Sequence, residues 1–194
     1  MKKILLLCIS LFLLSGCQNV KDMKIDDTLK VFSYSPDKPN VYRVGYKYNL
    51  PSGMQVDMYE DFTELISYNK INYYLYVDVV SYYNKVGNTY KENSGATYSK
   101  KLSINDKIGY LEVNKVENDK NLIEIMYNYA KIEVMVDLHD TNIAIINAIN
   151  ILKSIKFSDL VLDNYFGDDI FNFQEDVYDI FKTKDKDDYM GSIK

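Results

Sequence analysis

Three carboxylates that lie close together in the sequence, Glu60, Asp61 and Glu64, are the residues whose chemistry could break a bond. Two carboxyl groups that face each other across a cleft can hydrolyse a glycosidic bond. The spacing alone brings no two of these three groups to opposite sides of a cleft. We therefore predict no catalytic residue and no enzyme, and a carboxylate-based hydrolase stands as the alternative.

The chain has a single histidine, His139, which limits the other kinds of catalysis. A Ser-His-Asp triad would need His139, and no Gly-x-Ser-x-Gly elbow accompanies it. One histidine also excludes a metal site with several imidazole ligands. His139 falls between an expected strand and an expected helix, so we interpret it as an exposed structural residue.

Oxygen ligands for Ca²⁺ could come from the acidic clusters at residues 163–169 and 185–188, but neither cluster fits an EF-hand loop. No glycine-rich phosphate loop occurs either. We predict a solvated acidic surface at both clusters, with no metal site and no cofactor.

Tyrosine is the most prominent residue type with a binding role, with nineteen tyrosines and no tryptophan. Exposed tyrosines can form a platform for peptides or sugars, because they offer area and a hydroxyl at low entropic cost. Tyr74, Tyr76 and Tyr82 are the candidate binding residues, since alternation places them on one face of an expected strand. Tyr, Asn, Ile and Lys also have AT-rich codons, so these tyrosines could instead be ordinary half-buried sheet residues, which we favour.

Alternating apolar and polar residues predict a succession of strands that would carry these side chains. The clearest strand spans residues 71–83, with Tyr73, Leu75, Val77 and Val79 facing the core. Asn69-Lys70 is expected at a hairpin tip. The other expected strands span residues 41–50, 64–68, 98–104, 108–116, 121–127 and 131–137.

The period changes to 3.6 residues after Asp140 or Thr141, either of which could cap a helix that ends near residue 155. Ile145, Ala148, Ile149 and Leu152 form a wide apolar stripe, which must be buried against the sheet. Strands followed by one core helix predict an α+β fold, a twisted antiparallel sheet with a C-terminal core helix packed on it.

This order of elements, with Leu50-Pro51-Ser52-Gly53 after a strand and residues 127–136 leading into the helix, resembles the α/β/α sandwich of PsbP-like proteins. It also resembles uncharacterised lipoproteins of low-GC bacteria. The resemblance covers about residues 41–158 and rests on element order, so it implies a fold and no functional residue.

Charge is distributed unevenly along the chain. Residues 159–194 contain ten acidic and four basic residues, a net charge of −6, whereas residues 17–158 have a net charge of −1. Neither part offers the basic surface on which nucleic-acid binding depends, so we predict no nucleic-acid partner.

The N-terminal segment has the three parts of a signal peptide. Lys2 and Lys3 precede an uncharged apolar run at residues 4–14, which at 1.5 Å per residue covers about 16 Å and is too short to span a bilayer. Leu14-Ser15-Gly16-Cys17 then resembles the lipobox of bacterial lipoproteins. That resemblance implies cleavage before Cys17 and attachment of diacylglycerol to its thiol, which anchors a protein stably.

The sequence therefore predicts four regions: a cleaved signal peptide (1–16), a lipidated polar tether (17–29), an α+β domain (30–158) and an acidic C-terminal extension, partly helical or disordered (159–194). The predicted location is the extracytoplasmic face of the cell membrane, and the predicted partners are the membrane and an envelope protein, peptide or glycan. The predicted function is a binding or accessory domain without catalysis. A hydrolase of cell-envelope material is the alternative.

Overall fold

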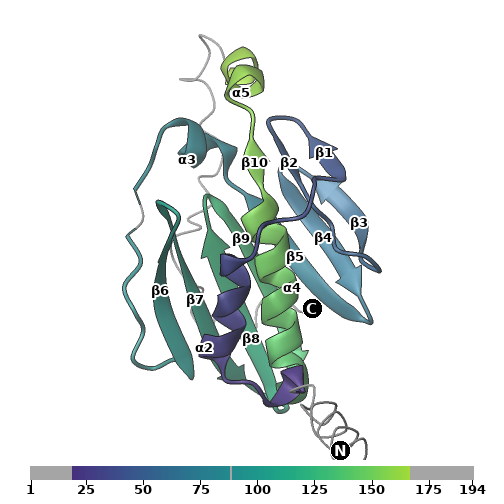
Figure 1. Ribbon diagram of the computed structural model, residues 1–194, viewed down its shortest axis with the longest axis vertical. Coiled ribbons are helices and arrows are strands. Elements are labelled where there is room, and N and C mark those ends of the chain that lie inside the picture. Colours follow the sequence, from purple (N-terminus) through teal and green to yellow (C-terminus); the bar gives the residue numbers. More distant parts are fainter. Residues whose placement is uncertain (1–18, 88, 167–194) are drawn as a thin grey trace, which may run out of the picture.

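A large antiparallel sheet with helices packed on one of its faces forms the body of the protein (Figure 1). The computed structural model describes residues 19–87 and 89–166. The large sheet has the strand order β3-β4-β5-β9-β8-β7-β6, and a small sheet has the order β1-β2-β10. The mixed α+β class and the helix on the sheet are thus confirmed.

The large sheet consists of β3 (Gln55–Glu60), β4 (Thr63–Tyr68), β5 (Ile71–Val77), β6 (Tyr98–Ile104), β7 (Lys107–Val116), β8 (Lys120–Tyr127) and β9 (Ala130–Asp137). The small sheet consists of β1 (Val41–Arg43), β2 (Tyr46–Tyr48) and β10 (Lys156–Phe157). The helices are α2 (Ile25–Thr28), α3 (Val79–Tyr83), α4 (Thr141–Ser154) and α5 (Asp159–Phe166), with 3₁₀ turns η1 (Val20–Asp22), η2 (Leu29–Ser33) and η3 (Leu138–Asp140).

Tight turns built from Asn and Asp join the strands of the large sheet. Each turn contains two adjacent residues with positive φ, a conformation that hairpins favour and that short polar side chains tolerate. The pairs are Asp61-Phe62, Asn69-Lys70, Asn105-Asp106, Asn118-Asp119 and Asn128-Tyr129. The predicted hairpin tip at Asn69-Lys70 is confirmed, and the last hairpin turns at Asn128-Tyr129.

Helix α4 supplies the apolar layer that covers the middle of the sheet, as its sequence period predicts. Ile145, Ala148, Ile149 and Leu152 are completely buried, and α4 contacts β8 and β9. At about 25 cal/mol per Å², burying a few large aliphatic side chains contributes on the order of 10 kcal/mol before entropy is subtracted. The core of the domain therefore lies between α4 and the sheet.

The prediction of one strand over residues 71–83 is wrong after Val77. Asp78 begins helix α3 instead, and its carboxylate oxygen Oδ1 accepts a hydrogen bond of 2.7 Å from the backbone N–H of Ser81. An aspartate in this position caps a helix by satisfying one of the free N–H groups of the first turn. Val79 is buried in both arrangements, so the alternating pattern could not reveal the change.

The single strand expected over residues 41–50 is a hairpin of β1 and β2. Gly45 makes the turn with a φ of +80°, which a side chain would strain. An added Cβ atom at Gly45 would also overlap the side chain of Leu162 in α5. Strand β3 has no counterpart among the predicted strands.

The segment predicted as a free tether, residues 17–29, is helical and packed from Val20 onward. The 3₁₀ turn η1 and the helix α2 contact α4, and the side-chain amide of Asn142 donates to the backbone carbonyls of Val20, Lys21 and Met23. The complete burial of Thr28 agrees with this packing. The buried Asn142 side chain therefore holds this segment against the N-terminal end of α4.

Helix α5 is the described part of the acidic extension, and Leu162 and Phe166 are buried in it. The signal peptide, Cys17 and residues 167–194 lie outside the described residues. Within residues 19–87 and 89–166, no helix is both long enough and apolar enough to cross a membrane.

Candidate functional site

The three tyrosines proposed from the sequence do not share one strand. Tyr74 lies on β5 and is 36% exposed, and Tyr76 lies on the same strand, half-buried, with the ammonium of Lys131 at 5.7 Å from its ring centroid. Tyr82 lies on α3 because the strand ends at Val77. The structure therefore places Tyr74 and Tyr76 on one strand and Tyr82 on a helix, where its ring lies 5.6 Å from that of Tyr129.

Tyr82 is held by several contacts. Its ring stacks on Phe157 with centroids 3.9 Å apart, and its hydroxyl donates to Asp159 at 2.8 Å. Burial and the hydrogen bond to the Asp159 carboxylate raise the pKa of Tyr82 to about 12. These contacts tie α3 to β10 and α5, so Tyr82 has a structural role.

Among the carboxylates, Glu60 and Asp61 are exposed where β3 turns into β4, whereas Glu64 is completely buried. The Glu64 carboxylate accepts hydrogen bonds from the hydroxyls of Tyr46 (2.9 Å) and Tyr48 (2.7 Å) and from the guanidinium of Arg43 (2.8 Å). Burial, and secondarily the Glu64 carboxylate, raise the pKa of both tyrosines, which keeps them as donors. The three carboxylates form no open catalytic pair.

A row of buried glutamates crosses the large sheet, and sequence reasoning missed it. Glu124 on β8 stands directly opposite Glu112 on β7 and Glu133 on β9, and all three are at most 1% exposed. The ammonium of Lys131 lies 2.7 Å from Glu133 and 3.9 Å from Glu124, and Tyr90 donates to Glu112. These charges are buried, so the row offers no carboxylate to a ligand in solution.

Asp137, His139 and Asp140 form a small group whose ligand atoms lie within 4.8 Å of one another. The group is exposed or half-exposed at the end of β9, as expected for a histidine between a strand and a helix. The ammonium of Lys21 lies 3.5 Å from the Asp140 carboxylate and already supplies a positive charge there. This arrangement is that of a surface ion cluster.

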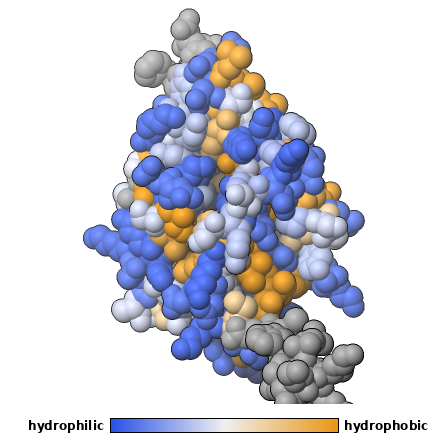
Figure 2. Space-filling model, in the orientation of Figure 1, coloured by the Kyte–Doolittle hydropathy of each residue, from blue (hydrophilic) through white to orange (hydrophobic). Residues whose placement is uncertain are grey.

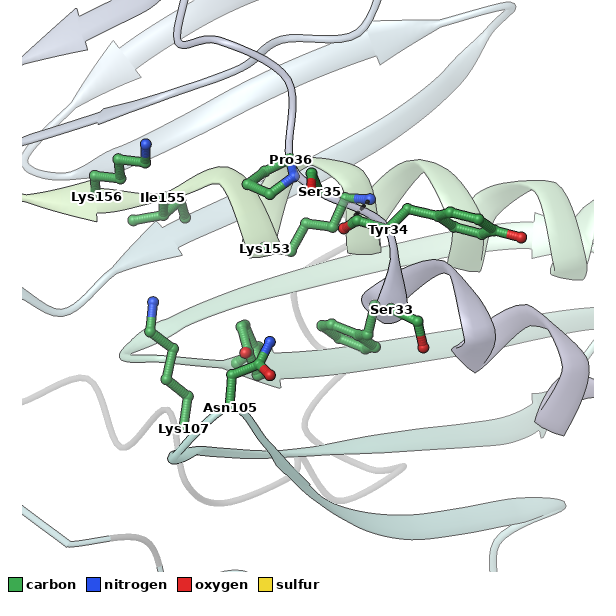
Figure 3. Close-up of a pocket in the computed structure, with 11 residues that line it drawn as sticks. Ser33, Tyr34, Ser35, Pro36, Asn105, Lys107, Lys153, Ile155 and Lys156 are labelled. Carbon is green, nitrogen blue, oxygen red and sulfur yellow. Dashed lines mark hydrogen bonds between the residues drawn. The ribbon is translucent and has the colours of Figure 1, made fainter.

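An open pocket of about 310 Å³ lies at the C-terminal end of α4, where four separate segments meet (Figure 3). Three lysines line it: Lys107 from the start of β7, Lys153 from the last turn of α4 and Lys156 from β10. No Asp or Glu from the described parts of the chain lines it with them. Pockets of this size are at the lower end of the range for small-molecule sites.

The electrostatics of the pocket favour an anion. Burial lowers the pKa of Lys107, and the nearby charge of Lys156 lowers it further. Within residues 19–87 and 89–166, neither the Lys107 ammonium nor the Lys156 ammonium lies within ion-pair distance of a carboxylate. Two cations that repel each other, with no acid between them, are stabilised by a bound anion.

The sequence could not reveal this pocket, because its three lysines belong to three different elements and form no motif along the chain. Lys107 follows the Asn105-Asp106 turn, and the other two lysines lie close together at the end of the expected helix. The one local signal was the pair Lys153 and Lys156, since basic residues often follow the last turn of a helix. Only the fold brings Lys107 to this pair.

Figure 2 shows apolar side chains at the top of this side of the molecule, over α5, and further apolar patches lower down among polar side chains. On α5, Leu160 is 73% exposed and Tyr165 is 47% exposed.

In a comparison with known proteins, no family model, curated protein or solved structure matches this chain.

Proposed function

We propose that this protein is a lipid-anchored, extracytoplasmic binding domain without catalytic activity, and that its ligand is an anion held in the three-lysine pocket. The observation that carries the proposal is the pair Lys107 and Lys156, two lysines without an acidic partner in the described chain that line one open pocket. Charge-assisted hydrogen bonds to an anion are about twice as strong as neutral ones. The pocket therefore offers a binding site for an anion.

The lipid anchor is proposed from the lipobox Leu14-Ser15-Gly16-Cys17. Two acyl chains on the Cys17 position are enough for stable membrane attachment. The packed segment begins at Val20, so three peptide steps separate it from Cys17, a reach of about 10 Å. A domain attached in this way stays close to the outer membrane face.

The anchor is tested by a Cys17→Ala variant in cells supplied with a labelled fatty acid. We expect complete loss of lipid labelling and a protein that is released or left unprocessed, because the acceptor thiol is gone. Cys8→Ala is the matched control and should keep the label, since Cys8 belongs to the apolar core of the signal. Persistent labelling of Cys17→Ala would refute the anchor.

The pocket is tested by calorimetric titration of inorganic phosphate and of 1-naphthoate into the full-length protein in nanodiscs. At least one of the two anions should bind with 1:1 stoichiometry. Replacing both cations, Lys107→Gln with Lys156→Gln, should weaken that binding at least about tenfold, since a hydrogen bond to a charged group contributes about 1.5–3 kcal/mol.

Lys91→Gln with Lys101→Gln is the matched control, because it removes the same charge from exposed lysines outside the pocket. Its affinity should equal that of the wild type. Equal losses in the two double variants would mean that net charge, and not the pocket, governs binding. Absence of binding by both anions would contradict the proposed function.

The PsbP-like order of elements remains part of the proposal and is supported by the run of antiparallel strands that leads into α4. The alternative, a carboxylate-based hydrolase of envelope material, requires two accessible carboxyl groups across a cleft. Hydrolysis that survives purification and is lost on one carboxylate substitution would favour it.

A further inference from the structure

The three lysines of the pocket differ in what their ammonium groups do. Lys153 donates to the backbone carbonyl of Val31 at 3.0 Å and to that of Tyr34 at 3.5 Å. Figure 3 shows Lys153 reaching toward Tyr34, while Lys107 and Lys156 lie apart from it, with Ile155 between them. The Lys153 ammonium is therefore engaged in holding the loop after η2. At the other end, the Lys107 ammonium lies 5.9 Å from the ring centroid of Tyr127, and neither Lys107 nor Lys156 pairs with a carboxylate of the described residues.

Apolar side chains line part of the pocket, which Ser33, Ser35 and Asn105 also line. Phe32 and Tyr127 pack with ring centroids 4.7 Å apart and an interplanar angle of 50°, and both are at most 5% exposed. The Tyr127 hydroxyl donates to the backbone carbonyl of Ile104, so it is satisfied within the fold. Ile155 and Pro36 complete this floor and wall.

A small inorganic anion would use only the cationic end and leave the apolar part hydrated. A ligand with two separated anionic groups would have to compete with two backbone carbonyls for Lys153. A ligand with one anionic group and an apolar body matches both parts, because burial of its body against the floor adds to the charge interaction.

We propose that the pocket takes an amphiphilic anion, a carboxylate or phosphate that carries a ring or short alkyl body. The anionic group would lie at Lys107 and Lys156, and the body would lie on the floor made by Phe32, Tyr127 and Ile155. This inference rests on the proposed function and specifies the class of its ligand.

The position of the pocket indicates where such a ligand comes from. The N-terminal end of α4 holds the segment next to the anchor through Asn142, whereas the pocket lies at the C-terminal end, beside Lys153. Asn142 and Lys153 are eleven residues apart, which at 1.5 Å per residue separates these ends by about 16 Å. The structure thus favours a ligand that arrives from solution over one that stays in the anchoring bilayer.

Three probes test the ligand class in calorimetric titrations of the full-length protein in phosphatidylcholine nanodiscs: 1-naphthoate, inorganic phosphate and 1-naphthalenemethanol. The first has the anion and the ring, the second only the anion and the third only the ring. We expect 1-naphthoate to bind at least about tenfold more tightly than either of the others. Phe32→Leu, with folding checked by thermal melting, should weaken 1-naphthoate and leave phosphate unchanged.

The outcomes separate the two proposals. If phosphate binds as tightly as 1-naphthoate and its binding depends on the two lysines, that result supports the anion site and overturns the proposal that the ligand is amphiphilic. Tighter binding of the neutral naphthalene also overturns it. If neither anion binds, the proposed function itself fails.

A second arm distinguishes the two sources of an amphiphilic anion. The titrations are repeated in nanodiscs that contain phosphatidylglycerol, and wild type is compared with Lys107→Gln/Lys156→Gln in each lipid. Persistence of the lysine-dependent affinity for 1-naphthoate supports a ligand from solution. Its disappearance in phosphatidylglycerol alone would mean that an anionic lipid occupies the pocket, which overturns the inferred source.

Discussion

An Ile149→Asp variant is expected to be unfolded at 25 °C. Ile149 is completely buried where α4 packs on the sheet, so the substitution removes a large apolar side chain and places a carboxylate in the core. The lost burial is worth about 1.5–3 kcal/mol, and an unpaired buried charge adds several kcal/mol more. Together they reach the total stability of a typical domain, about 5–15 kcal/mol.

Far-UV circular dichroism and thermal melting measure this effect. Asn150→Asp is the matched control, because it introduces the same side chain at the next position, on the less buried side of α4. The control should keep a cooperative transition. A cooperative transition in Ile149→Asp near the wild-type temperature would contradict the placement of α4 in the core.

A Glu64→Ala variant is expected to lose about 3–5 kcal/mol of stability, the cost of removing one partner from a buried ion pair. The substitution leaves Arg43 and the hydroxyls of Tyr46 and Tyr48 without their common acceptor. Urea denaturation measures the loss, and Glu60→Ala is the control at an exposed carboxylate, with an expected change within about 0.5 kcal/mol.

Glu64→Ala should also weaken anion binding, although Glu64 does not line the pocket. Glu64 links β4 to β2 through the two tyrosines, and β2 pairs with β10 so that Lys47 stands opposite Lys156. Loosening this connection moves a lysine that holds the ligand. Full stability together with full affinity in Glu64→Ala would show that the network has neither role.

The parts of the fold that could be predicted from the sequence are those fixed by neighbours along the chain. Alternation located β6 to β9 within a residue or so, and the 3.6-residue stripe located α4, because each pattern is set by burial on one side of one element. The Asn69-Lys70 turn was identified for the same reason, since a tight turn depends on the two residues that make it.

The failures occurred where a local pattern fits two structures. Residues 71–83 alternate throughout, yet Asp78 caps a helix, and both arrangements bury Val79. Residues 17–29 are polar enough for a tether, but Asn142, more than a hundred positions away, donates hydrogen bonds to the backbone of Val20, Lys21 and Met23. The pocket could not be predicted either, because Lys107 is far from Lys153 and Lys156 in the sequence and comes near them only in the folded protein.

The most direct test of the anion site is an NMR titration of the full-length protein in nanodiscs, with ¹³C-labelled lysine and tyrosine and 1-naphthoate as the ligand. We predict saturable shifts at Lys107 and Lys156, and a rise in the pKa of Lys107 as the bound anion offsets the effects of burial and of Lys156 that lower it. Shifts confined to Tyr74 and Tyr76, with the lysine signals and their pKa values unchanged, would contradict the account.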